Sequence, residues 1–201
     1  TIDKAKAKVT VKGNKDSKPY NGKNQSVSGY SLVSIDNDLY KESYFTLKEG
    51  KGTATRKNAG TTPMGLKSED FQNRNDNFDV EFVVSEDGSM TITQNTAEVT
   101  VTITGSEETK EYNGSEQTLE GFQSTVSGAE KAQIQVSLKA GKTAQAKGTN
   151  VGKYSMNLKA EDFEATSDNY SNIKVVVAKD GTLTIDKAKA KVTVKGNKDS
   201  K

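Results

Sequence analysis

Histidine, cysteine and tryptophan are absent from this chain of 201 residues, and their absence removes many kinds of functional site. Without cysteine there is no disulfide framework, and without histidine and cysteine the usual ligands of zinc are missing. Catalytic triads built on a histidine base are excluded as well. We therefore expect no enzyme, no metal site and no cofactor, and the sequence identifies no catalytic, cofactor-binding or ligand-binding residue.

An excess of one charge and long apolar runs are also missing. The 29 Lys and Arg residues nearly balance the 27 Asp and Glu residues, and only 6% of the residues are aromatic. Nucleic-acid binding usually needs a basic surface and aromatic stacking platforms, so we expect no nucleic-acid partner. No apolar run approaches the roughly 18 residues of a membrane span, and the first residues do not resemble a signal peptide. We expect no membrane insertion of this chain.

An internal repeat dominates what is present. Residues 1–18 return letter for letter as residues 184–201, a period of 183, and a weaker repeat of about 92 residues lies within it. Chance does not produce such a copy, so tandem duplication of a two-domain cassette is indicated. We predict homologous domains at 1–92 and 93–185, with neighbouring repeats as partners, and the first strand of a truncated third copy at 186–201. Matches across the weaker repeat include Val9 with Val101, Val11 with Ile103, Gly13 with Gly105, Gly29 with Gly121, Met64 with Met156 and Leu66 with Leu158.

Short alternations of apolar and polar residues, separated by polar turns, predict an all-β fold. No stretch has a helical period. The expected fold class is two tandem immunoglobulin-like β-sandwich domains of about seven strands each. The expected strands are residues 7–12, 26–33, 44–48, 52–56, 63–68, 79–85 and 89–94 in the first domain, and 99–104, 117–122, 132–138, 143–147, 153–159, 173–178 and 182–185 in the second.

Two short motifs predict tight turns. Tyr-Asn-Gly occurs at residues 20–22 and 112–114, and Asn-Gly favours a type I′ turn, in which both central residues take positive φ. The same reasoning predicts hairpin turns at Asp87-Gly88 and Asp180-Gly181. The alternative for Tyr-Asn-Gly is a recognition motif with exposed tyrosines, because tyrosine is enriched at binding hot spots.

A repeated Asn-x-Gly motif, at residues 58–60 and 150–152, resembles a corner of sandwich domains in which a tyrosine locks a connection. Tyr154 fits that role. The first domain has Thr62 at the matching position, so we expect its corner to be held differently.

The repeated Glu-Asp-Phe motif, at residues 69–71 and 161–163, precedes asparagine-rich stretches that end in Phe78 and Tyr170. We interpret each stretch as a polar crossover, fixed by aromatic side chains in the core.

Acidic residues are the remaining candidates for chemistry. Paired carboxylates at Asp36 and Asp38, and in the two Glu-Asp-Phe motifs, could act as acid and base, but no neighbours that would separate their pKa values are evident. Asp36 and Asp38 could also contribute oxygen ligands to Ca²⁺, although further ligands are missing. An internal Lys-to-Asn isopeptide bond stays open, since it needs only a Lys, an Asn and a buried acid.

These motifs together resemble the MBG (mostly bacterial immunoglobulin-like) repeats, and related YDG-type repeats, of large bacterial surface proteins. The resemblance covers nearly the whole chain and departs from the family at Thr62-Pro63, where an aromatic is usual, and at residues 123–133, which have little counterpart to residues 35–44. It implies an extracellular, cell-wall-anchored parent protein, especially of Gram-positive bacteria. The motifs that carry it are K-x-Y-N-G-x-x-Q at 18–25 and 110–117, L-K-x-E-D-F at 66–71 and 158–163, and D-G-T-L-T-I at 180–185.

The function expected for such repeats is structural. The stretches from Thr91 to Val101 and from Thr184 to Val192 contain no Gly-, Pro- or Ser-rich hinge, which favours a spacer that projects a distal domain from the cell wall. The alternative is an adhesive module that binds a host glycan or protein through the loops at residues 34–44 and 123–133.

Overall fold

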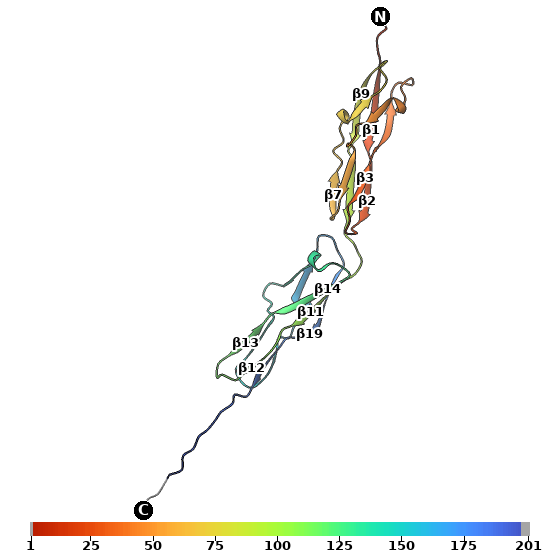
Figure 1. Cartoon of the computed structure of the whole chain (residues 1–201). Helices are drawn as coiled ribbons and strands as arrows, with labels where there is room; N and C mark the ends of the chain where they lie inside the picture. The colour runs from red at the N-terminus through yellow and green to blue at the C-terminus, as the bar shows by residue number, and fades with distance from the viewer. Residues whose placement is uncertain (1, 198–201) are drawn as a thin grey trace, which may run out of the picture. The chain divides into compact units, whose positions relative to one another are not determined.

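The computed structural model describes residues 2–197 and consists of two compact units of β-strands (Figure 1). Unit 1 contains the residues up to Ala97 together with Asp168–Ser171, and unit 2 contains Glu98–Ser167 with the residues from Asn172 onward. In the described part of the chain, the helical elements are four three-residue 3-10 turns: η1 (Glu42–Tyr44), η2 (Ser68–Asp70), η3 (Lys131–Gln133) and η4 (Ala160–Asp162). The prediction of an all-β fold is confirmed.

Unit 1 is a sandwich whose two halves each contain a pair of facing sheets. A three-stranded sheet in the order β4-β1-β9 lies in one half with the two-stranded sheet β5-β8. A three-stranded sheet in the order β2-β10-β7 lies in the other half with the two-stranded sheet β3-β6. The strands are β1 (Ala5–Gly13), β2 (Lys15–Pro19), β3 (Gln25–Ser28), β4 (Tyr30–Ile35), β5 (Phe45–Leu47), β6 (Thr53–Arg56), β7 (Gly60–Pro63), β8 (Phe71–Asn73), β9 (Phe78–Glu86) and β10 (Ser89–Thr93).

Unit 2 repeats this topology. Its sheets have the orders β14-β11-β19, β15-β18, β12-β20-β17 and β13-β16, which correspond one by one to those of unit 1. The strands are β11 (Val99–Gly105), β12 (Glu107–Glu111), β13 (Gln117–Glu120), β14 (Phe122–Ser127), β15 (Gln135–Leu138), β16 (Gln145–Gly148), β17 (Gly152–Ser155), β18 (Phe163–Thr166), β19 (Ile173–Lys179) and β20 (Thr182–Asp186).

The first and last strands of unit 1 form two long, parallel runs. β1 continues into β2 after one residue, and β9 continues into β10 after two, so each run passes from one sheet to the other. β1 pairs in parallel with β9, and β2 pairs in parallel with β10. Each unit thus has ten strand segments instead of about seven, partly because these runs are divided where they change sheets.

Glycines stand where the two runs come closest. A Cβ atom on Gly13 would lie only 2.2 Å from the backbone nitrogen of Gly88, and one on Gly105 would lie 2.2 Å from that of Gly181. No other residue type leaves room for two backbones at this distance. The glycines of the repeated Asp-Gly pairs are therefore required by a close crossing of strands.

The hairpins predicted at Asp87-Gly88 and Asp180-Gly181 are wrong. Neither glycine takes positive φ, and the strands on either side of each pair lie in different sheets. The Asp87 carboxylate instead accepts hydrogen bonds from the backbone N–H groups of Gly65 and Leu66, at 2.9 Å each. In unit 2 the Asp180 carboxylate holds the corresponding backbone in the same way.

These aspartates also explain why two strands are shorter than the sequence predicts. The strands predicted at residues 63–68 and 153–159 end early, at Pro63 and Ser155. Beyond them, Gly65 and Asn157 take positive φ, which interrupts the extended backbone. The Met-x-Leu segments are therefore loops that the aspartates hold against the core.

The apolar alternation of β1 fills the core of unit 1. Ala7, Val9 and Val11 are buried, whereas the three lysines of this strand are exposed. Aromatic side chains pack around these residues, including a T-shaped pair of Tyr30 and Phe71 with ring centroids 5.0 Å apart. The matching pair in unit 2, Phe122 and Phe163, has the same geometry at 4.9 Å, and its aliphatic core includes Val99, Val101, Ile103, Leu183 and Ile185.

The two aromatics predicted to fix the crossovers behave differently. Phe78 is buried in the core of unit 1, as predicted. Tyr170 is not in the core of unit 2: it belongs to the segment that is part of unit 1, where its ring meets that of Tyr20 edge-on at 5.5 Å. The prediction for Tyr170 is wrong because Ser171, not Tyr170, matches Phe78 when β9 and β19 are aligned by their pairing.

Substitution of Gly13 by alanine tests the close crossing. We expect Gly13→Ala to destabilise unit 1 by about 1–3 kcal/mol or more, because the new methyl group overlaps the backbone of Gly88. Chemical denaturation followed by circular dichroism would measure the loss. Gly196→Ala is a matched control, since Gly196 has the same flanking sequence and a Cβ atom there would have no neighbour within 4 Å. An equal effect of both substitutions would contradict the interpretation.

Candidate functional site

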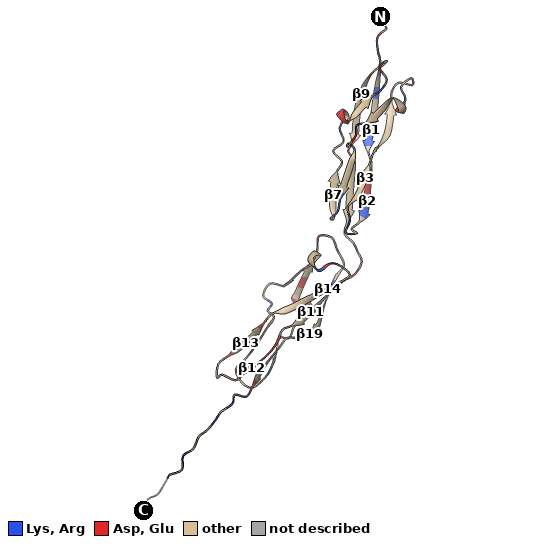
Figure 2. Ribbon diagram, viewed as in Figure 1, with Lys and Arg blue, Asp and Glu red and all other residues tan. Residues whose placement is uncertain are grey.

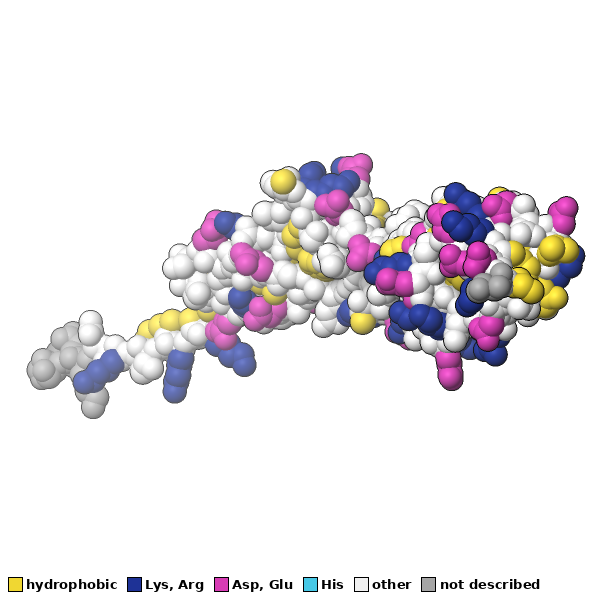
Figure 3. Space-filling view, turned by 90° about the horizontal axis from the view of Figure 1, so that it is seen from above, with side chains coloured by type: hydrophobic (Ala, Val, Ile, Leu, Met, Phe, Trp, Pro, Cys, Tyr) yellow, Lys and Arg dark blue, Asp and Glu magenta, His cyan; other side chains and the backbone are white. Residues whose placement is uncertain are grey.

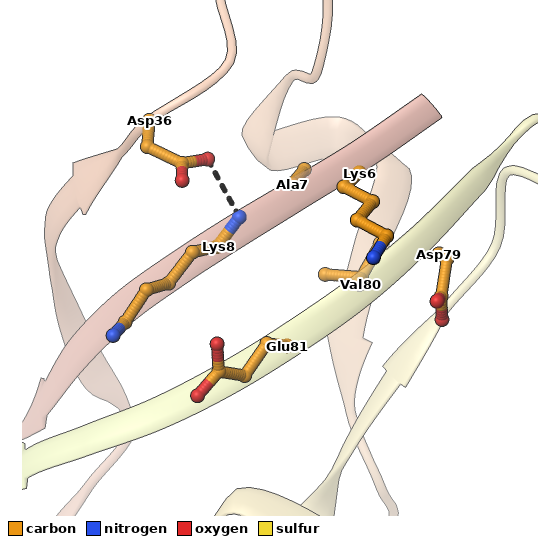
Figure 4. Close-up of a pocket in the computed structure, with 7 residues that line it drawn as sticks. All are labelled: Lys6, Ala7, Lys8, Asp36, Asp79, Val80 and Glu81. Carbon is orange, nitrogen blue, oxygen red and sulfur yellow. Dashed lines mark hydrogen bonds between the residues drawn. The ribbon is translucent and has the colours of Figure 1, made fainter. Parts of the chain in front are cut away.

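An open pocket of about 550 Å³ lies over β1 and β9 in unit 1 (Figure 4). Charged residues of both signs line it: Lys6 and Lys8 on β1, Asp79 and Glu81 on β9, and Asp36 from the loop after β4. In the parallel register Lys6 lies beside Asp79, and Lys8 beside Glu81. The two lysines offset two of the three carboxylates, so the pocket offers little concentrated charge to a ligand.

Asp36, a candidate Ca²⁺ ligand, serves the fold. One of its carboxylate oxygens accepts a hydrogen bond of 2.6 Å from the backbone N–H of Lys8, as the dashed line in Figure 4 shows. The side chain of Asn37 binds the backbone oxygen of Lys6. These contacts attach the loop to the edge of β1. Within residues 2–197, no group of three acidic, histidine or cysteine side chains is arranged to hold a metal ion.

The Glu-Asp-Phe motifs place one acidic side chain inside the protein. Asp70 is buried, caps the turn η2 through the backbone N–H of Lys67 at 2.9 Å, and forms an ion pair with Lys51 at 3.3 Å. Asp162 caps η4 in the same way and pairs with Lys142 at 2.7 Å. The hydrogen bond from Lys67 is the main reason that the pKa of Asp70 is lowered, and the bond from Lys142 is the main reason for Asp162. The sequence did not identify the two lysines, because they are distant from the motifs.

The glutamates of these motifs point elsewhere. Glu69 and Glu161 are exposed and form longer surface ion pairs with Lys67 and Lys159. Adjacent carboxylates, one inside and one outside, cannot act on the same bond of a substrate.

The predicted possibility of an isopeptide bond needs a Lys and an Asn enclosed beside a buried acid. In the described chain, each of the two buried acids instead faces a lysine that is about half exposed.

The Tyr-Asn-Gly motif forms a turn, but not of type I′. Only the glycines take positive φ, and the Asn21 side chain accepts a hydrogen bond from the N–H of Lys23, so the prediction of a type I′ turn is wrong. The last residue of K-x-Y-N-G-x-x-Q has a defined role, since Gln25 donates to the oxygen of Pro19 at 3.0 Å. Gln117 does the same to Glu111.

The two tyrosines of this motif differ in exposure. Tyr20 is 5% exposed and packs on Met90, Ile92 and Tyr170, so it is not available as a contact residue. Tyr112 is 40% exposed. In both units the backbone of the motif forms a turn, as the structural interpretation predicts. Of the two tyrosines, only Tyr112 is accessible to a binding partner.

The corner at the Asn-x-Gly motif is held by a different side chain in each unit. Tyr154 donates a hydrogen bond of 2.9 Å to the backbone oxygen of Asn150, as predicted. In unit 1, Arg56 binds the backbone oxygens of Asn58 and Ala59 at 2.8 and 2.7 Å. Gly148 stands where unit 1 has Arg56, and a Cβ atom there would lie 2.2 Å from the ring of Tyr154. Each corner therefore has room for one large side chain. In unit 1 it comes from β6, and in unit 2 it comes from β17, which corresponds to β7.

The loops proposed as an adhesive groove are mostly structured. In the loop at residues 34–44, Tyr40 is buried and donates to the Asn73 side chain at 2.8 Å, while Leu39 is 73% exposed. Residues 123–133 largely form β14 and η3. Basic and acidic residues are interspersed along the ribbon (Figure 2), and side chains of both signs are mixed on the face shown in Figure 3. Neither view shows a broad patch of one sign.

Placing an arginine in the corner of unit 2 would test whether a corner can hold only one large side chain. Gly148→Arg should destabilise unit 2 by about 1–3 kcal/mol, because Tyr154 occupies the space that the arginine needs. Adding Tyr154→Thr recreates the pair found in unit 1 and should restore part of the loss. Lys147→Arg, at the exposed neighbouring position, is the control in denaturant unfolding. If the double variant were less stable than Gly148→Arg alone, the two corners would not be equivalent.

The buried aspartates predict a loss of stability in acid. Their pKa values are lowered from 3.8 in the folded protein, so each carboxylate stabilises the fold above that pH. This contribution disappears as the pH falls through the lowered folded-state pKa. Asp70→Asn should reduce the melting temperature of unit 1 at neutral pH and make it less sensitive to acid. Glu69→Gln is the matched control, and an identical acid dependence in both variants would contradict the assignment.

Comparison with known families agrees with the resemblance noted from the motifs. The MBG domain family matches residues 99–187, whereas no curated protein and no solved structure matches the chain. MBG domains are repeats typical of bacterial surface proteins and are not known as enzymes. Across residues 2–197, no helix has the length and apolar character needed to cross a membrane. Unit 1 has the same order of strands in its sheets as unit 2, which contains most of the residues, 99–187, that the MBG domain family matches.

Proposed function

We propose that the chain provides spacer repeats of a bacterial surface protein, which hold a distal domain away from the cell wall. The observation that carries this proposal is the parallel pairing of the first and last strand runs in each unit. Because the two runs point the same way, the chain enters a unit at the start of one run and leaves at the end of the other. Every unit therefore adds its own length to the path of the chain.

The length gained is substantial for a domain of this size. The run from Ala5 to Pro19 spans roughly 50 Å, at about 3.3 Å for each residue of a strand. An antiparallel pair of terminal strands would return the chain to its starting end and add almost nothing. Parallel terminal strands are thus the arrangement that suits a spacer.

The repeat organisation is part of the proposal, with domains at 1–92 and 93–185 and the first strand of a further copy at 186–201. Residues 188–196 have the sequence of β1, yet Val192 and Val194 are 82% and 86% exposed, while Val9 and Val11 are fully buried. A segment with this alternation needs a sheet to cover its valines. Neighbouring repeats, an extracellular location and a cell-wall anchor in a Gram-positive organism fit this organisation.

An adhesive module remains the second candidate. One observation favours it: Leu39 projects from its loop beside an open pocket that Ile2, Ala5 and Phe78 also line. Exposed apolar side chains beside a depression are typical of contact surfaces. A host protein or glycan would then bind to unit 1 at this loop.

Surface display would test the spacer role. We expect a peptide tag at the tip of the displayed chain to move farther from the cell wall when the 183-residue cassette is duplicated, as measured by super-resolution localisation. An unchanged height would contradict a spacer.

A binding array would test the adhesive alternative. Saturable binding of the purified chain to a glycan or host protein would favour adhesion, provided that Leu39→Ser abolishes this binding and Lys41→Ser keeps it.

A further inference from the structure

We propose that the parallel pair of terminal runs in each unit is a mechanical clamp, which resists force applied through the two ends of that unit. The clamp matters only if the chain is a spacer, so it rests on the proposed function. A spacer between a cell wall and an attached object transmits every pull through its backbone. The strands that first meet this force are the first and last runs of each unit.

The ladder between these runs is nearly continuous in unit 1. It begins with the N–H of Ala5, which donates to the oxygen of Asn77 at 2.9 Å, and it ends with the N–H of Tyr20, which donates to Thr93 at 2.9 Å. Between these points the β1-β9 and β2-β10 pairs follow one another. At the crossing, the N–H of Ser89 donates to the oxygen of Asn14 at 3.1 Å, so the ladder continues from one sheet to the other.

Unit 2 has the same ladder. Its first bond joins the N–H of Val99 to the oxygen of Asn172 at 2.9 Å, and its last joins Tyr112 to Asp186 at 2.8 Å. At the crossing the N–H of Thr182 donates to Ser106 at 3.0 Å. The tyrosine of the Tyr-Asn-Gly motif therefore donates the final bond of the ladder in both units.

The direction of these runs decides how force acts on the ladder. A pull on the two ends of a unit drives the runs past each other along their length, because they are parallel and the chain enters and leaves at opposite ends. The inter-strand hydrogen bonds lie across this direction, so they must fail together. In an antiparallel terminal pair, the same pull would open the bonds one at a time.

Side chains strengthen the ladder across the two runs. An ion pair joins Lys15 on the first run to Glu86 on the last, and the Ser85 hydroxyl donates to the oxygen of Val11 at 3.0 Å. In unit 2, Lys179 pairs with Glu107. The buried valines of β1 also keep water away from one face of the ladder, so that water competes less for its hydrogen bonds.

The two units should differ in strength. β1 and β9 form eight residue pairs, whereas β11 and β19 form six, and the second half of each ladder has five. Because the number of bonds that must fail together is larger in unit 1, unit 1 should unfold at the higher force.

Single-molecule pulling of the full chain in two directions tests the clamp. The chain has no cysteine, so paired cysteines define the points of attachment. Asp3→Cys with Ala97→Cys pulls the runs of unit 1 past each other, while Asp3→Cys with Asp76→Cys pulls them apart from the end at which both begin. The peak unfolding force at one loading rate should be several-fold higher in the first geometry. Equal peaks, or a higher peak in the second geometry, would overturn the proposal.

Unit 2 provides an independent repetition of this experiment. Glu98→Cys with Lys187→Cys slides its runs, and Glu98→Cys with Lys174→Cys peels them apart. Thermal unfolding of the four double-cysteine chains should first be unchanged from that of the original chain. If the variants of one unit do not fold, the variants of the other unit provide the test. A spacer that lengthens with each cassette but shows no directional difference would retain the proposed function and exclude the clamp. If duplication of the cassette left the height of the displayed tag unchanged while the directional difference in force persisted, the spacer would be excluded.

Discussion

The close approach of Gly13 to Gly88 is the constraint on which the rest of each unit depends. Two strand runs can pass from one sheet to the other side by side only if neither carries a side chain at the crossing. The crossing keeps the runs parallel along both sheets, and it brings the Asp87 carboxylate to the loop that covers the crossing. Met64, from that loop, then packs over Gly88 and belongs to both core clusters. Gly105, Gly181 and Met156 repeat the arrangement in unit 2.

The two units show how one backbone tolerates different side chains. Unit 1 fills its larger core cluster with aromatic rings, among them Phe82, whereas the corresponding position in unit 2 is Val175. The corners exchange a large side chain between facing positions, with Arg56 in one unit and Tyr154 in the other. The positions that hold backbone stay the same, among them the crossing glycines and the buried aspartates. The shared motif residues are thus explained by the fold, without a ligand.

Much of the fold could be predicted from the sequence, because apolar alternation is strong where a strand is covered on one face. β1, β9 and β20 are recognisable in this way. β2 and β12 are not, since Lys15–Pro19 and Glu107–Glu111 are charged and lie at the edges of their sheets, where pairing with β10 or β20 makes them strands. Asp-Gly suggests a hairpin by local preference, and only the long-range partner of Gly88 shows that it is a crossing. Likewise, the lysines that pair with Asp70 and Asp162 come from distant loops, so no local pattern identifies them.

The central position of β1 has a consequence for how each unit is made. Its partner β9 begins more than 60 residues later in the chain, so on the ribosome the first strand emerges long before the strand that completes its sheet. Until then its valines are uncovered, as Val192 and Val194 are in the identical segment at residues 188–196. During synthesis of a tandem array, the waiting strand could be captured by the wrong repeat. Differences between adjacent repeats, such as Phe82 against Val175, would make such mispaired sheets fit less well and so favour assembly of each unit from its own strands.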